Sequence, residues 1–349
     1  MTGFDVVVLG EPMVERHRTT DGTPTAADSV SGDAFNAACA AALAGARVAL
    51  LTVLGTDRAG DLVLDELARR GVDPSLVRRG SEPTGAYTVT PDERGQPRFS
   101  YQRAGSAAST LARAHLEHWG AVLDDTPVLI TSGITAALSP TSAELVRAAV
   151  ARVAAAGGAA CYDVNFRPNL TTAALARQAL LAVAPACRLV KLASPGDAEP
   201  LLGVTDPAAV CAALRQLGGQ LGGQVGGQVG GQRGSTAVVV TRGAQPLLVT
   251  DGATTTRHPA IALPTPVDST GAGDTLLGTL AAAMARGEDL AAAAPLAVVA
   301  AGLSTQHRGG APRATLAEVR AALSAAHPAT QPTDQHVAPP QALTEEARP

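Results

Sequence analysis

The sequence predicts an α/β protein with a mostly parallel central sheet, helices flanking that sheet and a small β lid. Two observations lead to this fold class. Short apolar runs alternate along the chain with longer segments of helical periodicity, which is the pattern of β-α-β units. Between residues 84 and 104, polar and apolar residues instead alternate on either side of a turn, which predicts an antiparallel hairpin outside the main sheet.

The strands and helices of the main sheet can be placed from these patterns. Val6-Val7-Val8-Leu9 is typical of a buried parallel strand, and Gly10 begins the turn after it. The other apolar runs that predict strands are residues 48–55, 128–133, 159–165, 188–192 and 237–241. The segments that predict helices are residues 33–44, 57–70, 141–156 and 314–326. Residues 16–31 predict a short hairpin or a loop, and Asp33 is a candidate N-cap for the helix that it opens.

Composition limits the classes of protein that fit. The chain has 349 residues, 46% hydrophobic and 17% charged, with a formal net charge of −4, so we expect a globular protein that binds no nucleic acid. No apolar run is long enough to span a membrane, and the chain opens on a strand pattern and not a signal peptide, so we expect a cytoplasmic protein. The four cysteines have no metal-ligand spacing. Lys191 is the only lysine, and arginine supplies the remaining positive charge.

The predicted hairpin carries residues suited to binding a small molecule. Two of the three tyrosines, Tyr87 and Tyr101, lie on it, followed by Arg103. A polar hairpin that projects from an α/β chain can cover a site as a lid, and we expect the lid to comprise residues from about 12–33 and 84–104. An ordinary edge hairpin is the alternative.

The strongest functional signal is Val267-Asp268-Ser269-Thr270-Gly271-Ala272-Gly273-Asp274. Its small residues precede an apolar helical pattern that Gly287 is placed to stop. Free N–H groups and the helix dipole make such a helix N-terminus an anion hole suited to phosphate. An acid beside that hole, Asp274, would accept a proton from an attacking hydroxyl. We expect the helix N-terminus to keep Asp274 ionised, which makes it a weak base in the ground state. A structural turn with a capping Asp is the alternative.

Two segments are not expected to contribute to the core. Residues 218–234 repeat a Gly-Gly-Gln-X unit, which predicts a flexible expansion of a loop. Residues 327–349 are rich in Pro, Gln and Thr and predict a disordered tail, which leaves one domain over residues 1–326. Walker A, dinucleotide-binding, zinc-protease and serine-hydrolase motifs are all absent from the sequence.

Five segments appear in an order that resembles the ribokinase-like (PfkB) carbohydrate kinases. They are Gly10-Glu11-Pro12-Met13-Val14-Glu15, Gly32-Asp33-Ala34-Phe35-Asn36, Ser194-Pro195-Gly196-Asp197-Ala198-Glu199, Thr241-Arg242-Gly243 and Asp268 to Asp274. Within that family, Tyr101 to Ala107, Ser132 to Thr135 and Asp163 to Arg167 are similar to 2-keto-3-deoxygluconate kinases. The resemblance covers roughly residues 4 to 325 and implies a ribokinase-like fold.

The resemblance implies a role for each matching residue. Asp274 would be the catalytic base, and Gly271, Ala272 and Gly273 would hold the transferring phosphate. ATP would bind at Ser194, Thr241, Gly243, Gly271 and Gly273, and Asp197 would organise Mg²⁺ through water. The substrate-binding residues would be Gly32, Asn36, Tyr87, Tyr101, Arg103, Ile134 and Arg167. In this family the lid often pairs between subunits, so a homo-oligomer through the lid is expected.

Three functions stay open from the sequence. The first is a kinase for 2-keto-3-deoxygluconate that forms the 6-phosphate, because Arg103 and Arg167 would converge on a carboxylate that a neutral hexose lacks. The second is a fructokinase-like or other PfkB sugar kinase, in which both arginines pair with protein acids or with ATP phosphates. The third is a catalytically weak sugar-binding regulator on the same fold.

Overall fold

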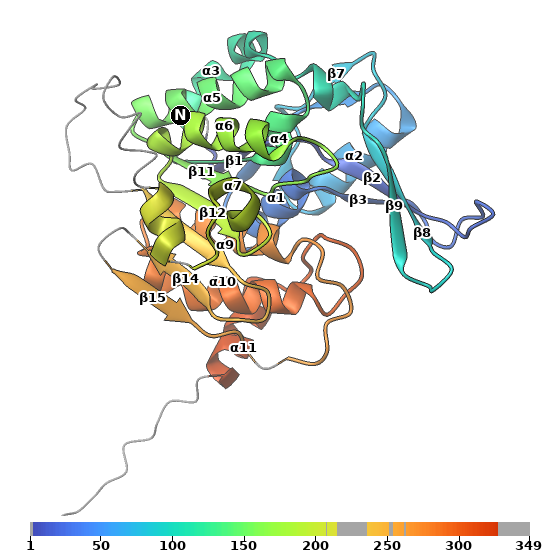
Figure 1. Ribbon diagram of the computed structural model, residues 1–349. Helices are drawn as coiled ribbons and strands as arrows, with labels where there is room; N and C mark the ends of the chain where they lie inside the picture. The colour runs from blue at the N-terminus through green and yellow to red at the C-terminus, as the bar shows by residue number, and fades with distance from the viewer. Residues whose placement is uncertain (1–2, 207, 215–235, 251–253, 262, 327–349) are drawn as a thin grey trace, which may run out of the picture.

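A computed structural model describes residues 3–206, 208–214, 236–250, 254–261 and 263–326. Its centre is a sheet in the order β15-β14-β13-β12-β11-β10-β1-β4-β6 (Figure 1). The strands of this sheet are β1 Val6–Leu9, β4 Val48–Leu51, β6 Val72–Asp73, β10 Val128–Ser132, β11 Ala159–Asp163, β12 Leu189–Ala193, β13 Ala237–Thr241, β14 Leu247–Thr250 and β15 Thr255–His258. All neighbours pair in parallel from β6 to β13, and β14 and β15 add antiparallel pairings at one edge.

Helices cover both faces of this sheet (Figure 1). They are α1 Asp33–Leu43, α2 Arg58–Arg69, α3 Leu116–Asp124, α4 Gly133–Ala137, α5 Pro140–Ala155, α6 Ala173–Val183, α7 Ala198–Leu202, α9 Ala272–Ala285, α10 Leu290–Ser304 and α11 Leu316–Ala326. Strand β1 shows how the sequence builds two cores, since successive side chains of a strand point to opposite faces. Val6 and Val8 pack with α1 and α9, whereas Val7 and Leu9 pack with α3 and α5.

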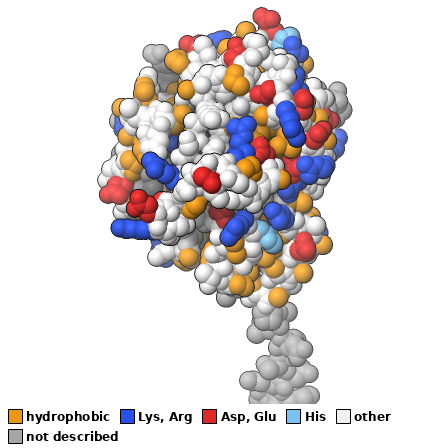
Figure 2. All heavy atoms as spheres, turned by 90° about the vertical axis from the view of Figure 1, so that its right-hand side faces the viewer, with side chains coloured by type: hydrophobic (Ala, Val, Ile, Leu, Met, Phe, Trp, Pro, Cys, Tyr) orange, Lys and Arg blue, Asp and Glu red, His pale blue; other side chains and the backbone are white. Residues whose placement is uncertain are grey.

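A second sheet projects from this body, on the right of Figure 1. Its order is β3-β2-β8-β9, from β2 Met13–His17, β3 Ser29–Ser31, β8 Ala86–Pro91 and β9 Pro97–Gln102. The hairpin expected from residues 84–104 is therefore present, and residues 16–31 contribute to a β2–β3 pair. Positive and negative side chains are interspersed on this side of the molecule (Figure 2), without one basic patch.

The structure refines several predicted elements. The run 48–55 forms two strands, because β4 ends at Leu51 and β5 Val53–Gly55 pairs instead with β7 Arg78–Gly80. Asp33 is not the N-cap of α1; Gly32 takes that position at φ 112°, where a Cβ would meet the carbonyl oxygen of Glu11 at 2.7 Å. The predictions for residues 218–234 and 327–349 lie outside the described residues.

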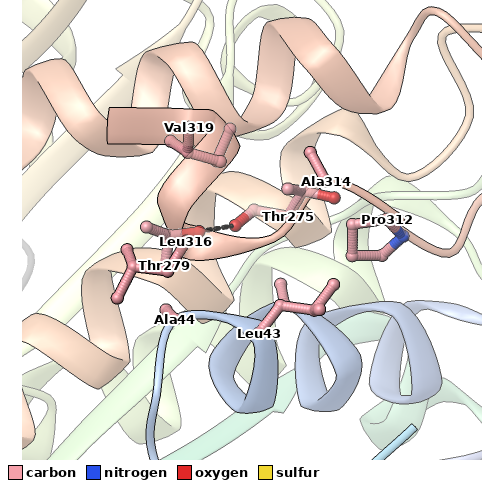
Figure 3. Close-up of a pocket in the computed structure, with 10 residues that line it drawn as sticks. Leu43, Ala44, Thr275, Thr279, Pro312, Ala314, Leu316 and Val319 are labelled. Atoms are coloured by element: carbon pink, nitrogen blue, oxygen red, sulfur yellow. Dashed lines mark hydrogen bonds between the residues drawn. The ribbon is translucent and has the colours of Figure 1, made fainter. Parts of the chain in front are cut away.

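Helices α1 and α9 pack against one another and carry the motif residues to the sheet. Gly278 of α9 allows the close approach, because a Cβ there would overlap the backbone of Ala37. Helix α11 packs against α10, and residues of α1, α9, α10 and α11 together line a cavity of about 20 Å³ whose walls are apolar except for Thr275 and Thr279 (Figure 3). The hydroxyl of Thr279 donates to the carbonyl oxygen of Thr275 across 2.8 Å, inside α9. Thr275, which directly follows Asp274, is buried in this packing.

Candidate active site

The start of α9 has the geometry expected of an anion hole. Gly271 is its N-cap in the left-handed conformation, at φ 75°, and a Cβ on this residue would overlap the carbonyl oxygen of Gly310. Only glycine fits both constraints. The N–H of Ala272 donates to the carbonyl oxygen of Ser269 across 3.4 Å, whereas the N–H groups of Gly273 and Asp274 have no carbonyl partner within the helix, so they are available to an anion. Asp274 lies in the first turn of α9.

The side chain of Asn36 holds Asp274 in place. Its Nδ2 atom donates to Oδ2 of Asp274 across 2.9 Å, which joins α1 to α9. The carbonyl oxygen Oδ1 of Asn36 has no hydrogen-bond partner among the described residues. Asn36 therefore orients the carboxylate, a role additional to the substrate contact expected from the sequence.

Asp274 differs from the sequence-based expectation in its charge. Burial, together with the nearby carboxylates of Asp33 and Asp163, raises the pKa of its carboxyl group to about 7. Lys191 and the Asn36 amide act in the opposite direction but are outweighed. The prediction that the helix N-terminus keeps Asp274 a weak, ionised base was wrong, because desolvation and two like charges exceed the helix dipole. A carboxylate with this pKa is suited to general-base work at neutral pH.

Asp33 has a different role from the predicted cap. Its Oδ2 atom accepts a hydrogen bond from the hydroxyl of Ser132 across 2.5 Å, at the end of β10. Its Oδ1 atom has no partner among the described residues, and neither does the hydroxyl of Thr131. Both residues, together with Asp163 and Asp274, line a cavity of about 10 Å³, which is about the size of one water molecule.

The lid residues form one aromatic and ionic group. The rings of Tyr87 and Tyr101 lie 5.6 Å apart between centroids, with Tyr87 buried and Tyr101 51% exposed. The guanidinium of Arg103 lies 5.7 Å from the centre of the Tyr101 ring. Nε of Arg103 donates to Glu11 across 2.6 Å, and the hydroxyl of Ser106 donates to the other oxygen of Glu11 at the same distance.

Arg103 and Arg167 therefore stand in different environments. The pairing of Arg103 with a protein acid is the alternative that the sequence left open, and it uses one nitrogen of the guanidinium. Nη2 of Arg103 is buried and has no partner among the described residues. Arg167 follows β11, is exposed, and donates from Nη1 to the carbonyl oxygen of Phe166 across 3.2 Å. Ile134 lies on α4, directly after β10, and is buried.

The residues expected at the nucleotide lie after β12 and β13. The hydroxyl of Ser194 donates to the carbonyl oxygen of Thr205 across 2.8 Å, and Thr241 ends β13. Gly243 is left-handed at φ 59°. Asp197 is buried, and its two oxygens accept from the backbone N–H groups of Phe166 at 2.9 Å and Ala193 at 2.7 Å. Asp197 thus joins two loops at this edge of the sheet, and its role toward Mg²⁺ stays a prediction.

Sequence reasoning missed the ion pair beneath the site. Nζ of Lys191, on β12, donates to both oxygens of Asp163, on β11, at 2.7 and 2.9 Å. Asp163 and Lys191 are register partners in neighbouring strands. The available signal was the isolation of Lys191, a single lysine among arginines, inside an apolar strand.

The candidate active site does not coincide with the large pocket of the molecule. A pocket of about 770 Å³ lies between α5, α6 and the 168–172 loop and contains none of the catalytic residues expected from the sequence. Within the described parts of the chain, no group of three or more His, Cys, Asp or Glu side chains is arranged to hold a metal ion. The side chains and N–H groups near Asp274, and not a large pocket or a metal-binding group, therefore identify the site.

The comparisons with known proteins agree with this chemistry. The model of the pfkB family of carbohydrate kinases matches residues 4–315. The chain belongs to this family. The 2-dehydro-3-deoxygluconokinase of Thermoproteus tenax is 30% identical over 314 residues, which cover 88% of this chain and 90% of the relative. The 2-dehydro-3-deoxygalactonokinase of Haloferax volcanii is 28% identical, over 80% of this chain and 82% of the relative.

As a pfkB carbohydrate kinase, the chain is a phosphotransferase that acts on a small sugar or sugar derivative. The ribokinase-like fold is also confirmed by solved structures. An Escherichia coli protein described as a ribokinase II, solved in complex with ATP and Mg²⁺, superposes with a TM-score of 0.76 at 23% identity, over 92% of this chain and 99% of that one. Among the described residues, no helix is both long and apolar enough to cross a membrane.

Proposed function

We propose that this pfkB kinase transfers the γ-phosphoryl group of ATP to 2-keto-3-deoxygluconate and forms the 6-phosphate. This compound is the 2-dehydro-3-deoxygluconate of the Thermoproteus tenax relative's name. The Haloferax volcanii relative's name points to a substrate that differs only in the configuration of a hydroxyl group. Both substrates carry a carboxylate. The substrate class that we propose is therefore a 2-keto-3-deoxy sugar acid, and the gluconate form is the preferred candidate.

The observation that carries this proposal is the free nitrogen of Arg103. Its Nη2 atom is buried without a partner in the described part of the chain, although Nε of the same side chain pairs with Glu11. An unpaired guanidinium nitrogen inside a protein is costly, and a carboxylate oxygen satisfies it with a charge-assisted hydrogen bond. A neutral hexose offers only hydroxyl groups at this position. Arg103 therefore favours an anionic substrate.

Arg167 supplies the second positive charge. It follows the carboxyl end of β11, at the sheet edge where open α/β folds bind ligands, and its hydrogen bond among the described residues goes to the carbonyl oxygen of Phe166 and not to an acidic side chain. We infer that Arg167 turns to the C1 carboxylate when the sugar acid binds. Gly32, Asn36, Tyr87, Tyr101 and Ile134 complete the proposed sugar contacts.

With C1 at the arginines, the far-end hydroxyl lies at Asp274. The hydroxyl oxygen attacks the γ-phosphorus, the bond from that phosphorus to the bridging oxygen of ADP breaks, and Asp274 accepts the hydroxyl proton. The N–H groups that follow Gly271 stabilise the charge on the transferring phosphoryl group. Asn36 keeps the accepting carboxylate oriented.

ATP and Mg²⁺ fit the residues present. Ser194, Thr241 and Gly243 would border the nucleotide beside the anion hole. Mg²⁺ commonly uses one or two carboxylates together with substrate phosphates and waters, so it does not require a group of three metal-binding side chains, and the described residues contain none. Asp197 would reach the ion through water. The metal supplies charge neutralisation to the phosphates when bound.

We also propose a homo-oligomer that pairs through the lid. Phe99 and Tyr101 on β9 are 46% and 51% exposed, which is unusual for large apolar side chains on one strand. Burial of this face against the same face of a second copy would remove it from water. The sedimentation velocity of the protein would measure the oligomeric state.

Arg167→Ala tests the substrate class. A charge-assisted hydrogen bond contributes about 1.5–3 kcal/mol, so the variant should raise KM for the keto-acid about 10- to 150-fold and change fructose turnover far less. ADP release over both keto-sugar acids, fructose and ribose is the assay. Arg177→Ala, an exposed arginine on α6, is the matched control. A wild-type preference for fructose, or an equal loss on both substrates in Arg167→Ala, would replace the proposal with a fructokinase-like function.

A further inference from the structure

Lys191 is buried, and it is the only lysine of the chain. All other basic residues except histidines are arginines. Lys191 is 5% exposed, in the middle of the parallel sheet, between β11 and β13. A lysine at such a depth is rare unless a partner compensates its charge. Its position therefore calls for a reason beyond strand packing.

The ammonium group lies directly under the anion hole. A Cβ built on Gly273 would stand 2.9 Å from Nζ of Lys191 and 3.3 Å from its Cε. On its other side, Nζ contacts both oxygens of Asp163 at 2.7 and 2.9 Å. The ammonium is thus fixed between a strand carboxylate and the helix turn that would receive the phosphate.

Several buried carboxylates surround Lys191, and their negative charge has to be compensated by a nearby cation. The carboxylates of Asp33 on α1, Asp163 on β11 and Asp274 on α9 act on one another. Lys191 faces Asp163 and Asp274, and Asp197 also acts on it from the start of α7. Burial alone lowers the pKa of Lys191, yet these carboxylates leave it raised, so the ammonium stays charged at neutral pH.

We propose that Lys191 is an electrostatic positioning residue of the phosphoryl-transfer site, which keeps Asp274 available as an anion and places a fixed positive charge beneath the transferring phosphate. The inference depends on the proposed base role of Asp274 and not on the identity of the sugar. It also explains the need for glycine at position 273, where a side chain would displace the ammonium. Lysine suits the position because its ammonium is compact, whereas the planar guanidinium of arginine needs more room.

The test compares three variants by the pH dependence of kcat. Lys191→Met removes the positive charge, so the acidic limb of the profile should move to higher pH by roughly one unit, which by itself lowers activity at pH 7 about fivefold. Asp163→Asn removes a negative charge that raises the pKa of Asp274, so its limb should move to lower pH. The double variant Asp163→Asn with Lys191→Met should return toward the wild-type limb.

A purely structural ion pair predicts a different pattern. Both single variants would then lose activity at all pH values without opposite shifts of the limb, and that result would overturn the proposal. Thermal unfolding of each variant shows whether it is folded. The profiles can be recorded with whichever sugar the enzyme turns over, so a wrong substrate class leaves this test intact.

A second measurement keeps Lys191 in place and observes it directly. Because the chain has a single lysine, protein labelled at lysine Cε and Nζ gives one side-chain NMR signal. We expect this signal to report a charged, solvent-protected ammonium from about pH 6 to about pH 9. Asp274→Asn, which leaves the sheet intact, should move it clearly, whereas the exposed Asp124→Asn should not. A signal typical of an exposed lysine, or one insensitive to Asp274→Asn, would contradict the proposal.

Discussion

Asp274→Asn should change activity and stability in opposite directions. The amide has nearly the shape of the carboxylate and its Oδ1 can still accept from Nδ2 of Asn36, so the geometry of α9 is retained. The amide cannot accept the proton of the attacking hydroxyl. We expect kcat to fall about 10²- to 10⁴-fold, the range for loss of a general base, with ATP binding nearly unchanged.

The stability change follows from the raised pKa of Asp274. In the unfolded chain the carboxyl group has a pKa of 3.8, and in the folded protein it has a pKa of about 7. Between these values the folded state binds more protons, so stability from this group falls as pH rises from about 4 to about 7, and the full cost is present above pH 7. At about 1.36 kcal/mol per pKa unit, the cost at pH 8 is on the order of 1–4 kcal/mol.

Asp274→Asn removes that cost, so its free energy of unfolding should exceed that of the wild type at pH 8 and approach it at pH 4. Urea unfolding at both pH values, with ADP release at pH 8, provides the measurements. Asp124→Asn is the control: this exposed residue pairs with Arg152, and the pKa of its carboxyl is lowered by that hydrogen bond, so the variant should not gain stability. A near-normal kcat in Asp274→Asn would refute the base assignment, and an unchanged pH dependence of stability would refute the raised pKa.

Two further predictions concern glycines. Gly271→Ala should abolish most activity and lower the free energy of unfolding by several kcal/mol, because the new Cβ would overlap the backbone of Gly310. Gly287→Ala, at φ 77° in open space, should lower it by only about 1–2 kcal/mol. Urea unfolding and kcat distinguish the two variants. Trimming residues 218–234 to a short Gly-containing turn should change stability little, since a doubling of loop length costs only about 0.6 kcal/mol; a melting temperature or kcat well below the wild type would show that the segment has a function.

Local patterns were enough to predict most of the architecture. Apolar runs such as Val6–Leu9 and Val128–Ser132 are buried on both faces of a parallel sheet, so their position depends on composition alone. The hairpin of β8 and β9 alternates with period two, and the helix before Gly287 has its own stop signal. The weakest predictions were the division of residues 48–55 and the cap of α1, where a bend of one or two residues decides the outcome.

The sequence by itself determined the family, the fold class and the candidate base, because the order of short motifs and the glycines of one helix N-terminus depend on neighbouring residues only. The tertiary structure decided the electrostatics of the site. Asp33, Asp163, Lys191 and Asp274 are far apart along the chain, and their charges act on one another only after four different elements bring them together. Burial then raises the pKa of Asp274 to about 7, against the sequence-based expectation, since desolvation depends on everything that surrounds a side chain and not on its place in a motif.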